Sequence, residues 1–194
     1  IALNPAAKIF QDFPNTGLYP FSTYLPQILA VKAGVLMGLS ILNLLYLTRV
    51  CTLLFWIFLI SKSIQITPAY KWAFAFLALL PSSLFINASA SGDVVTNGLA
   101  FLVLAIFYRI IIEKSKKTSW PQMAWLTLGI GILSLNKFVY APILLLSFLF
   151  PKSAFEQPKY RNWFAWALLL FALALVAVWN LKTSALFVPK DAYN

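Results

Sequence analysis

Three ionisable side chains stand inside or beside long apolar runs, and each could do chemistry there. Arg49 lies in LTRVCTLL, Asp93 in SASGDVVTNG and Lys137 in LSLNKFVYAP. An ionisable residue at membrane depth costs free energy, so it usually faces protein or water and often marks a functional site. Asp93 could bind a divalent cation (Mg²⁺ or Mn²⁺) or orient an acceptor group. Lys137 and Arg49 could hold a phosphate, since ammonium and guanidinium groups bind phosphate oxygens.

Each of these residues also has a structural interpretation, which the sequence leaves open. Ser91 or Asp93 could satisfy the free backbone N–H groups of a helix that begins there, and this is compatible with a functional role. Arg49 could form an ion pair between helices. Lys137 could extend its side chain toward the membrane interface.

The remaining composition excludes several classes of site. The chain has no histidine and one cysteine, Cys51, so a disulfide within the chain and a histidine-ligated zinc site are excluded. The net charge of +10 could suggest nucleic-acid binding. However, lysine and arginine fall mostly in short patches between apolar runs, and no basic face with interleaved aromatic residues lies outside those runs. We therefore expect no nucleic-acid partner.

The balance of residue types is typical of an integral membrane protein. Hydrophobic residues make up 61% of the chain and charged residues 10%, with a mean hydropathy of +0.83. A soluble domain has about 25% charged residues, so this chain could not cover a soluble surface. Membrane lipids are thus the first expected partners.

The apolar runs predict an all-α fold, a polytopic transmembrane helix bundle with about six crossings. Residues 1–40 are expected to form an outer loop and an outer interfacial helix (Leu25–Gly38), residues 41–181 the membrane spans, and residues 182–194 the start of an outer segment. The four single spans are expected at Ile41–Ile60, Trp72–Ile86, Val94–Ile112 and Phe164–Leu181.

The run Met123–Phe150 is too long for one ordinary span, and Asn136–Lys137 interrupts it. Basic loops near residues 62–71, 109–120 and 151–162 hold most of the lysine and arginine, which places all three in the cytoplasm. The run must then enter and leave the membrane as a short helical hairpin with Lys137 at its outer apex. The alternative is one long tilted span, which would put the last basic loop outside.

This topology gathers the unusual polar residues at the outer face. Arg49, Asp93 and Lys137 converge there with the neighbouring amide of Asn136. The aromatic segment containing Tyr19 and Tyr24 lies over the same face, as aromatic residues do at a membrane interface. We expect Tyr19, Tyr24 and Asn136 to line the substrate site.

Four stretches of residues 18–150 together resemble the GT-C superfamily of membrane glycosyltransferases. The closest likeness is to an uncharacterised bacterial branch labelled only as a predicted membrane protein of unknown function. In chain order the four stretches are YPFSTYLPQ, LTRVCTLLFW, LLPSSLFINASASGDVVTNGLAFL and LGIGILSLNKFVYAPILLL.

The resemblance implies transfer of a sugar from a polyprenyl-phosphate carrier to an acceptor, outside a bacterial inner or plasma membrane, for cell-envelope synthesis. Asp93 would match the second-loop acid near the metal or acceptor, and Lys137 and Arg49 would lie near the lipid phosphate.

One departure from the resemblance concerns the catalytic base. Such enzymes place their key acid in the first outer loop after an initial span, and no residue here matches it, so we assign no catalytic residue. The chain begins with Ile1 and ends at Asn194, just beyond an apolar run. We expect it to be an interior section of a longer protein, inactive alone, with the base upstream of Ile1.

Two other functions stay open from the sequence. One is a transporter or flippase subunit for lipid-linked sugars or polymers, because short helices and an Asn–Lys interruption could form the broken helices of a transport site. The other is a non-catalytic membrane scaffold in a cell-envelope assembly.

Overall fold

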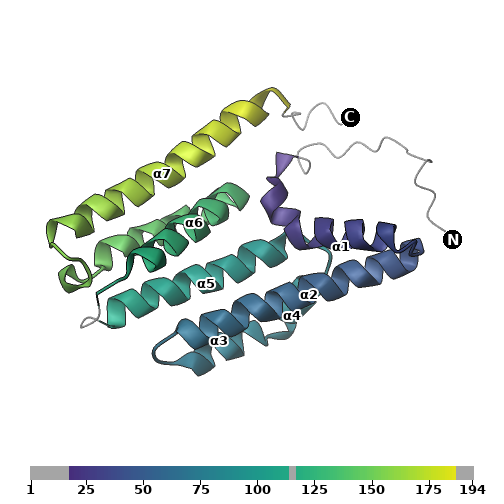
Figure 1. Cartoon of the computed structure of the whole chain (residues 1–194), viewed down its shortest axis with the longest axis horizontal. Coiled ribbons are helices and arrows are strands. Elements are labelled where there is room, and N and C mark those ends of the chain that lie inside the picture. Colours follow the sequence, from purple (N-terminus) through teal and green to yellow (C-terminus); the bar gives the residue numbers. More distant parts are fainter. Residues whose placement is uncertain (1–17, 114–116, 187–194) are drawn as a thin grey trace.

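A computed structural model describes residues 18–113 and 117–186, and every regular element within them is a helix (Figure 1). This confirms the all-α prediction. The elements are η2 (Phe21–Tyr24), α1 (Leu25–Leu36), α2 (Ile41–Ile66), α3 (Lys71–Ala78), α4 (Pro81–Asn87), α5 (Asp93–Ile112), α6 (Trp120–Asn136), η3 (Phe138–Leu149), η4 (Lys152–Ala154), α7 (Lys159–Thr183) and η5 (Ser184–Leu186).

The parts of the expected outer segments at residues 1–17 and 187–194 lie outside the described residues, as do two lysines of the middle basic loop, Lys114 and Lys116.

Among the described residues, three helical segments are long and apolar enough to cross a membrane: α2, α5, and α7 with η5. They coincide with the spans expected from residues 41, 94 and 164, and α2 runs six residues beyond its predicted end at Ile60. The ends of α5 agree with its dipole, with Asp93 in the first turn and Arg109 in the last. The expected total of about six crossings is not confirmed.

The predicted single helix Trp72–Ile86 is wrong. The chain forms α3 with 8 residues and α4 with 7, and Pro81 is the first residue of α4. Proline has no N–H to donate, and its ring clashes with the carbonyl four residues earlier in a continuous helix. Leu80, directly before it, has an extended ψ of 138°, as residues before proline favour.

The chain turns back on itself at Lys137, as the predicted hairpin requires, and one long continuous helix is wrong. That both arms cross the membrane, with Lys137 at an outer apex, stays a prediction. Lys137 has extended backbone angles between α6 and η3. The two arms end close together, because the Thr118 N–H donates to the Ala154 carbonyl across 2.9 Å. The second arm is a 3-10 helix of 12 residues with Pro142 inside it, unusually long for this helix type.

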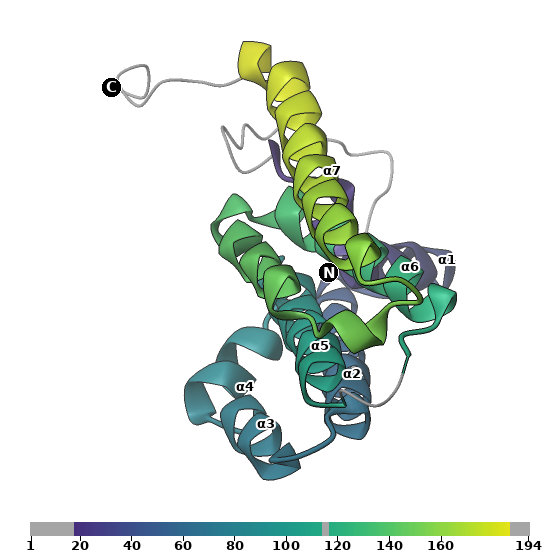
Figure 2. The ribbon, with the colours of Figure 1, turned by 90° about the vertical axis from the view of Figure 1, so that its left-hand side faces the viewer.

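The helices form layers, with α7 on one side and α3 and α4 on the other (Figures 1 and 2). Helix α5 lies centrally, because its residues enter two apolar clusters. One joins α5 to α6, η3 and α7 and includes Phe107 and Phe150, whose ring centres are 5.2 Å apart. The other joins the start of α5 to α2 and α3 and includes Val94 and Trp56. This packing fixes where the first turn of α5 meets the end of α6.

The helix predicted for Leu25–Gly38 is present as α1, which packs along the first half of α2 (Figure 1). Its placement at the membrane interface stays a prediction. Gly38 ends it with φ +65°, and the next N–H, from Leu39, donates to the Gly34 carbonyl across 3.0 Å. This is the left-handed glycine termination common at helix ends.

Replacing Gly38 with alanine is expected to lower the free energy of unfolding by about 1 kcal/mol, because a Cβ disfavours this left-handed backbone. No atom lies within 4 Å of the added Cβ, so steric contact adds nothing. Thermal unfolding of the protein in detergent measures the effect. Gly38→Asn is the control and should cost less, since asparagine tolerates this conformation.

Candidate functional site

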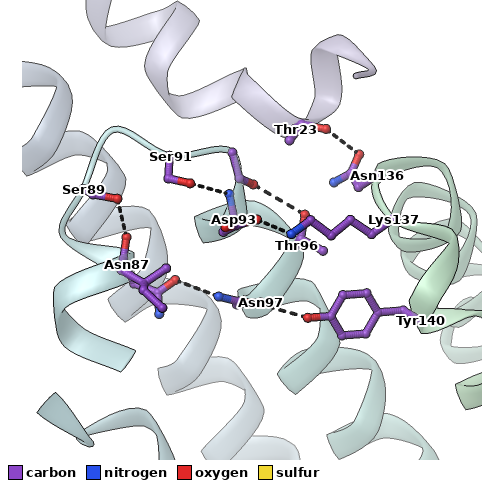
Figure 3. Close-up of polar contacts among 12 residues, drawn as sticks. Thr23, Asn87, Ser89, Ser91, Asp93, Thr96, Asn97, Asn136, Lys137 and Tyr140 are labelled. Carbon is purple, nitrogen blue, oxygen red and sulfur yellow. Dashed lines mark hydrogen bonds and ion pairs between the residues drawn. The ribbon is translucent and has the colours of Figure 1, made fainter. Parts of the chain in front are cut away.

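An ion pair between two helix ends lies at the centre of the candidate site (Figure 3). Lys137 Nζ, at the junction of α6 and η3, donates to Asp93 Oδ1 in the first turn of α5, across 2.5 Å. Sequence interpretation expected both residues at one face, and the structure brings them into contact. The two side chains are 38% and 40% exposed, so the pair is open to solvent. Such a pair adds little stability and remains accessible to a ligand.

The pKa of Lys137 is shifted mainly by this contact. The hydrogen bond to Asp93 raises the pKa of Lys137 above its ordinary value, and partial burial opposes that shift. Since the pKa of a lysine is already far above 7, the ammonium is charged at neutral pH. Because the pKa of Lys137 is raised in the folded protein, the ion pair with Asp93 stabilises the fold at neutral pH. This stabilisation is lost only in the strongly alkaline range, where Lys137 loses its proton.

Backbone geometry prepares Asp93 for this contact. Ser91 Oγ accepts a hydrogen bond from the Asp93 N–H across 3.2 Å, which satisfies one of the first N–H groups of α5. The capping role expected for Ser91 is therefore present, and the Asp93 carboxylate is left to pair with Lys137. Gly92 is required beside it, because a Cβ there would lie 2.4 Å from the Thr23 methyl and 3.1 Å from the Tyr24 ring.

Asn136 ties the segment before α1 to the end of α6. Its Oδ1 accepts hydrogen bonds from Ser22 Oγ (2.7 Å) and Thr23 Oγ1 (3.1 Å). The residue is 2% exposed, and its Nδ2 has no partner among the described residues. Gln27 of α1 is similar, since its Nε2 donates to the Ser91 carbonyl while its buried Oε1 has no described partner. A bound polar ligand or water would satisfy such groups.

The prediction about Ser22 and Thr23 concerns stability. The double variant Ser22→Ala with Thr23→Val is expected to lower the free energy of unfolding by about 1–3 kcal/mol, because it leaves the buried Asn136 amide without a donor. Thermal unfolding in detergent checks this. The control is Ser89→Ala, because the Ser89 hydroxyl donates an exposed hydrogen bond to the nearby Ile86 carbonyl. This variant should change the free energy of unfolding little.

A cavity of about 660 Å³ lies beside Lys137, between residues 18–20, the end of α6 and the end of α7. Two of the three residues predicted to line a substrate site, Tyr19 and Asn136, line this cavity together with Lys137. That the cavity holds a substrate stays a prediction. Tyr24 does not line it and packs against Gly92 instead. From α7, Trp179 adds an aromatic wall, and its Nε1 donates to the Leu18 carbonyl across 3.0 Å.

Arg49 is tied to the turn before Asp93 and has no described contact with the ion pair. Its Nε donates to the Ala88 carbonyl across 3.1 Å, at the end of α4. The neighbouring Thr52 Oγ1 donates to the Ser89 carbonyl across 3.2 Å. The structural interpretation from the sequence was an ion pair between helices. The hydrogen bond described for Arg49 is instead to a backbone carbonyl. Its side chain holds the turn that presents Asp93.

Neutral polar side chains extend the site into the bundle, and sequence interpretation missed them (Figure 3). Tyr140 donates to Asn97 Oδ1 across 3.2 Å, and Asn97 Nδ2 donates to Asn87 Oδ1 across 3.5 Å. One signal could have found them. Asn97 follows Asp93 by four residues and Tyr140 follows Lys137 by three, so each shares a helical face with a predicted site residue.

The ion pair carries no net charge, and the described residues around it offer few ligands to a metal ion. Within the described residues, no group of three or more Asp, Glu, Cys and His side chains could hold a metal. Asp93 is a single carboxylate with an ammonium 2.5 Å away, which would repel a divalent cation. Mg²⁺ or Mn²⁺ at Asp93 therefore does not fit these residues. Lys137, which lines the cavity, fits a phosphate oxygen.

Comparison with known proteins identifies the family of this chain. A family model described as "Predicted membrane protein (DUF2142)" matches residues 2–194. No curated protein and no solved structure matches the chain.

Proposed function

The chain belongs to this family of predicted membrane proteins, and we propose that it forms the donor-binding part of a GT-C-like membrane glycosyltransferase. The donor is a sugar carried on polyprenyl phosphate, used at the outer face of a bacterial inner membrane to build envelope polysaccharide or glycoconjugates. One observation carries the proposal: a lysine that lines a cavity with both apolar and polar walls is held by a carboxylate at the end of an apolar helix bundle.

Lys137 binds the phosphate of the carrier in this proposal. Its ammonium group lies next to apolar helices that can contact a polyprenyl chain, and it lines the cavity that would hold the sugar. Charge builds on the phosphate as it leaves the sugar, and a fixed cation stabilises that charge more than the charge of the bound donor.

Asp93 holds the ammonium group in position and accepts hydrogen bonds. A lysine side chain has many rotamers, and a contact at 2.5 Å selects one of them. Asp93 could also orient an acceptor hydroxyl through its second oxygen. Because it is engaged by Lys137, we give it the role of a positioning residue.

The lining of the cavity fits a sugar. Tyr19 and Trp179 supply aromatic surface, and Asn136 and Asn180 supply amide groups that can bond to hydroxyls. Ligand pockets commonly combine apolar walls with a few polar groups of this kind. The unpartnered Asn136 Nδ2 would donate to a ligand oxygen after a small side-chain movement.

The proposed reaction is a direct displacement. The acceptor hydroxyl oxygen forms a bond to the anomeric carbon, the bond from that carbon to the phosphate oxygen breaks, and the phosphate keeps the electron pair. The hydroxyl proton passes to a general base, which we assign to none of the described residues.

A transfer assay tests the proposal. The full-length protein in proteoliposomes is given radiolabelled polyprenyl-phosphate sugars and a membrane extract as the source of acceptor. We expect labelled acceptor together with released polyprenyl phosphate. If no donor in a broad panel is consumed while the protein stays folded, the proposal is wrong.

The two broken helical pairs favour a second candidate, a flippase or transporter for lipid-linked sugars. Helices α3 and α4 are divided at Pro81, and α6 and η3 at Lys137. Divided helices often build transport sites. Movement of a fluorescent polyprenyl-phosphate sugar between vesicle leaflets, without transfer of the sugar, would support this function over the first.

A further inference from the structure

A second cavity, also of about 660 Å³, lies between α2, α5 and α6. It forms a groove with apolar walls. From α5 it is lined by Leu99, Leu102 and Ile106, which repeat at helical spacing on one face. On α6, Leu128 and Ile132 line the opposite part.

One end of the groove is basic. Lys62 of α2, Arg109 of α5 and Lys117 before α6 all line it there, against one acidic residue, Glu113. This is the end at which the basic loops lie, and Figure 2 views the molecule from it. Arg109 Nε contacts Glu113 Oε2 at 3.2 Å, so the two lysines supply the excess positive charge. The Asp93–Lys137 pair lies at the opposite end of α5.

The length of the groove fits a lipid tail. From Leu99 to Glu113 the α5 face covers about 21 Å, at 1.5 Å per residue. One leaflet of a bilayer has a hydrocarbon depth of about 15 Å, half of the total core. The apolar part of the groove therefore matches an acyl chain of one leaflet, and the basic end matches the phosphate of the lipid headgroup.

We propose that this groove binds an anionic phospholipid of the inner leaflet. One acyl chain lies along the apolar faces of α5 and α6, and the phosphate lies at the end formed by Lys62 and Lys117. Charge complementarity selects this occupant, because a zwitterionic lipid gains less from the basic end and a soluble anion leaves the apolar walls empty. The lipid holds α2 and α6 on the two sides of α5. Neither the ligand nor the site depends on the proposed sugar transfer.

Native mass spectrometry of the full-length protein, titrated with phosphatidylglycerol or with phosphatidylcholine, tests the charge requirement. We expect tighter binding of phosphatidylglycerol. The variant Lys62→Gln with Lys117→Gln should weaken it about 25-fold, because each basic residue near an anionic headgroup contributes about a factor of five. Lys71→Gln with Lys152→Gln is the matched control, since it removes two charges at the same end outside the groove, and it should bind as the wild type does.

A second variant tests the apolar part. Leu102→Trp fills the groove and leaves every charge in place, so it should weaken phosphatidylglycerol binding at least tenfold while circular dichroism stays unchanged. Glycerol phosphate, which has no acyl chain, should not compete. The proposal is overturned if both lipids bind equally, if the control pair weakens binding as much as the groove pair, or if glycerol phosphate displaces the lipid.

Discussion

Replacing Lys137 with alanine is expected to lower sugar transfer by the full-length protein about 100- to 1000-fold. Removing one preorganised group that stabilises developing charge has an effect of this size in other enzymes. The ammonium group is the cation that lines the proposed donor cavity and contacts Asp93 at 2.5 Å. The initial rate of labelled acceptor formation, at saturating and at limiting donor, measures the loss.

Two variants serve as controls for that result. Lys137→Arg keeps the charge but changes its shape, so it should retain part of the activity. Lys152→Ala removes the same charge from an exposed position in the basic loops, and it should transfer sugar as the wild type does. A Lys137→Ala protein within threefold of the wild type would contradict the role given to this residue.

Replacing Gly98 with valine is expected to give a large loss of stability. Gly98 lies where α5 meets α2, and a Cβ added there would be 2.5 Å from Leu59 Cδ1 and 3.2 Å from Leu59 Cβ. Membrane helices use small residues for such close contact, and overpacking costs about 1–3 kcal/mol. The midpoint of unfolding in mixed micelles should fall clearly, because the α2–α5 contact also positions the first turn of α5.

Gly129→Val is the comparison for this variant. A Cβ at Gly129 would meet only a Val103 methyl at 3.2 Å, so the cost should be smaller. Adding Leu59→Ala to Gly98→Val should recover part of the lost stability, since it removes the colliding side chain. If Leu59→Ala gives no recovery, close packing of α2 on α5 does not explain the loss.

The long helices could be predicted because the signal of an apolar run is energetic and local. The Lys137 hairpin was predicted from the length of the run Met123–Phe150, its interruption at Asn136–Lys137 and the basic loops on both sides of it. Pro81 carried an equally local signal, a missing N–H and a steric clash. It was outweighed by the apolar run around it, and so α3 and α4 were predicted as one helix.

The neutral part of the site could not be predicted in the same way. Asn97, Tyr140 and Trp179 carry no charge, so their cost in an apolar helix is modest and their sequence context is ordinary. The hydrogen bond between Tyr140 and Asn97 depends on how η3 rotates against α5, and the hydrogen bond from Trp179 to the Leu18 carbonyl depends on where α7 lies. Long-range packing sets both. No local sequence pattern predicts the contact between Asn136 and residues 22–23, because the two segments are more than a hundred positions apart.

Binding of polyprenyl phosphate to the full-length protein in nanodiscs tests the central claim most directly, because it needs neither the acceptor nor the general base. The account predicts that Lys137→Ala weakens this binding at least tenfold, whereas Lys152→Ala leaves it unchanged. Equal affinity of the wild type and Lys137→Ala for polyprenyl phosphate would show that Lys137 does not hold the carrier phosphate.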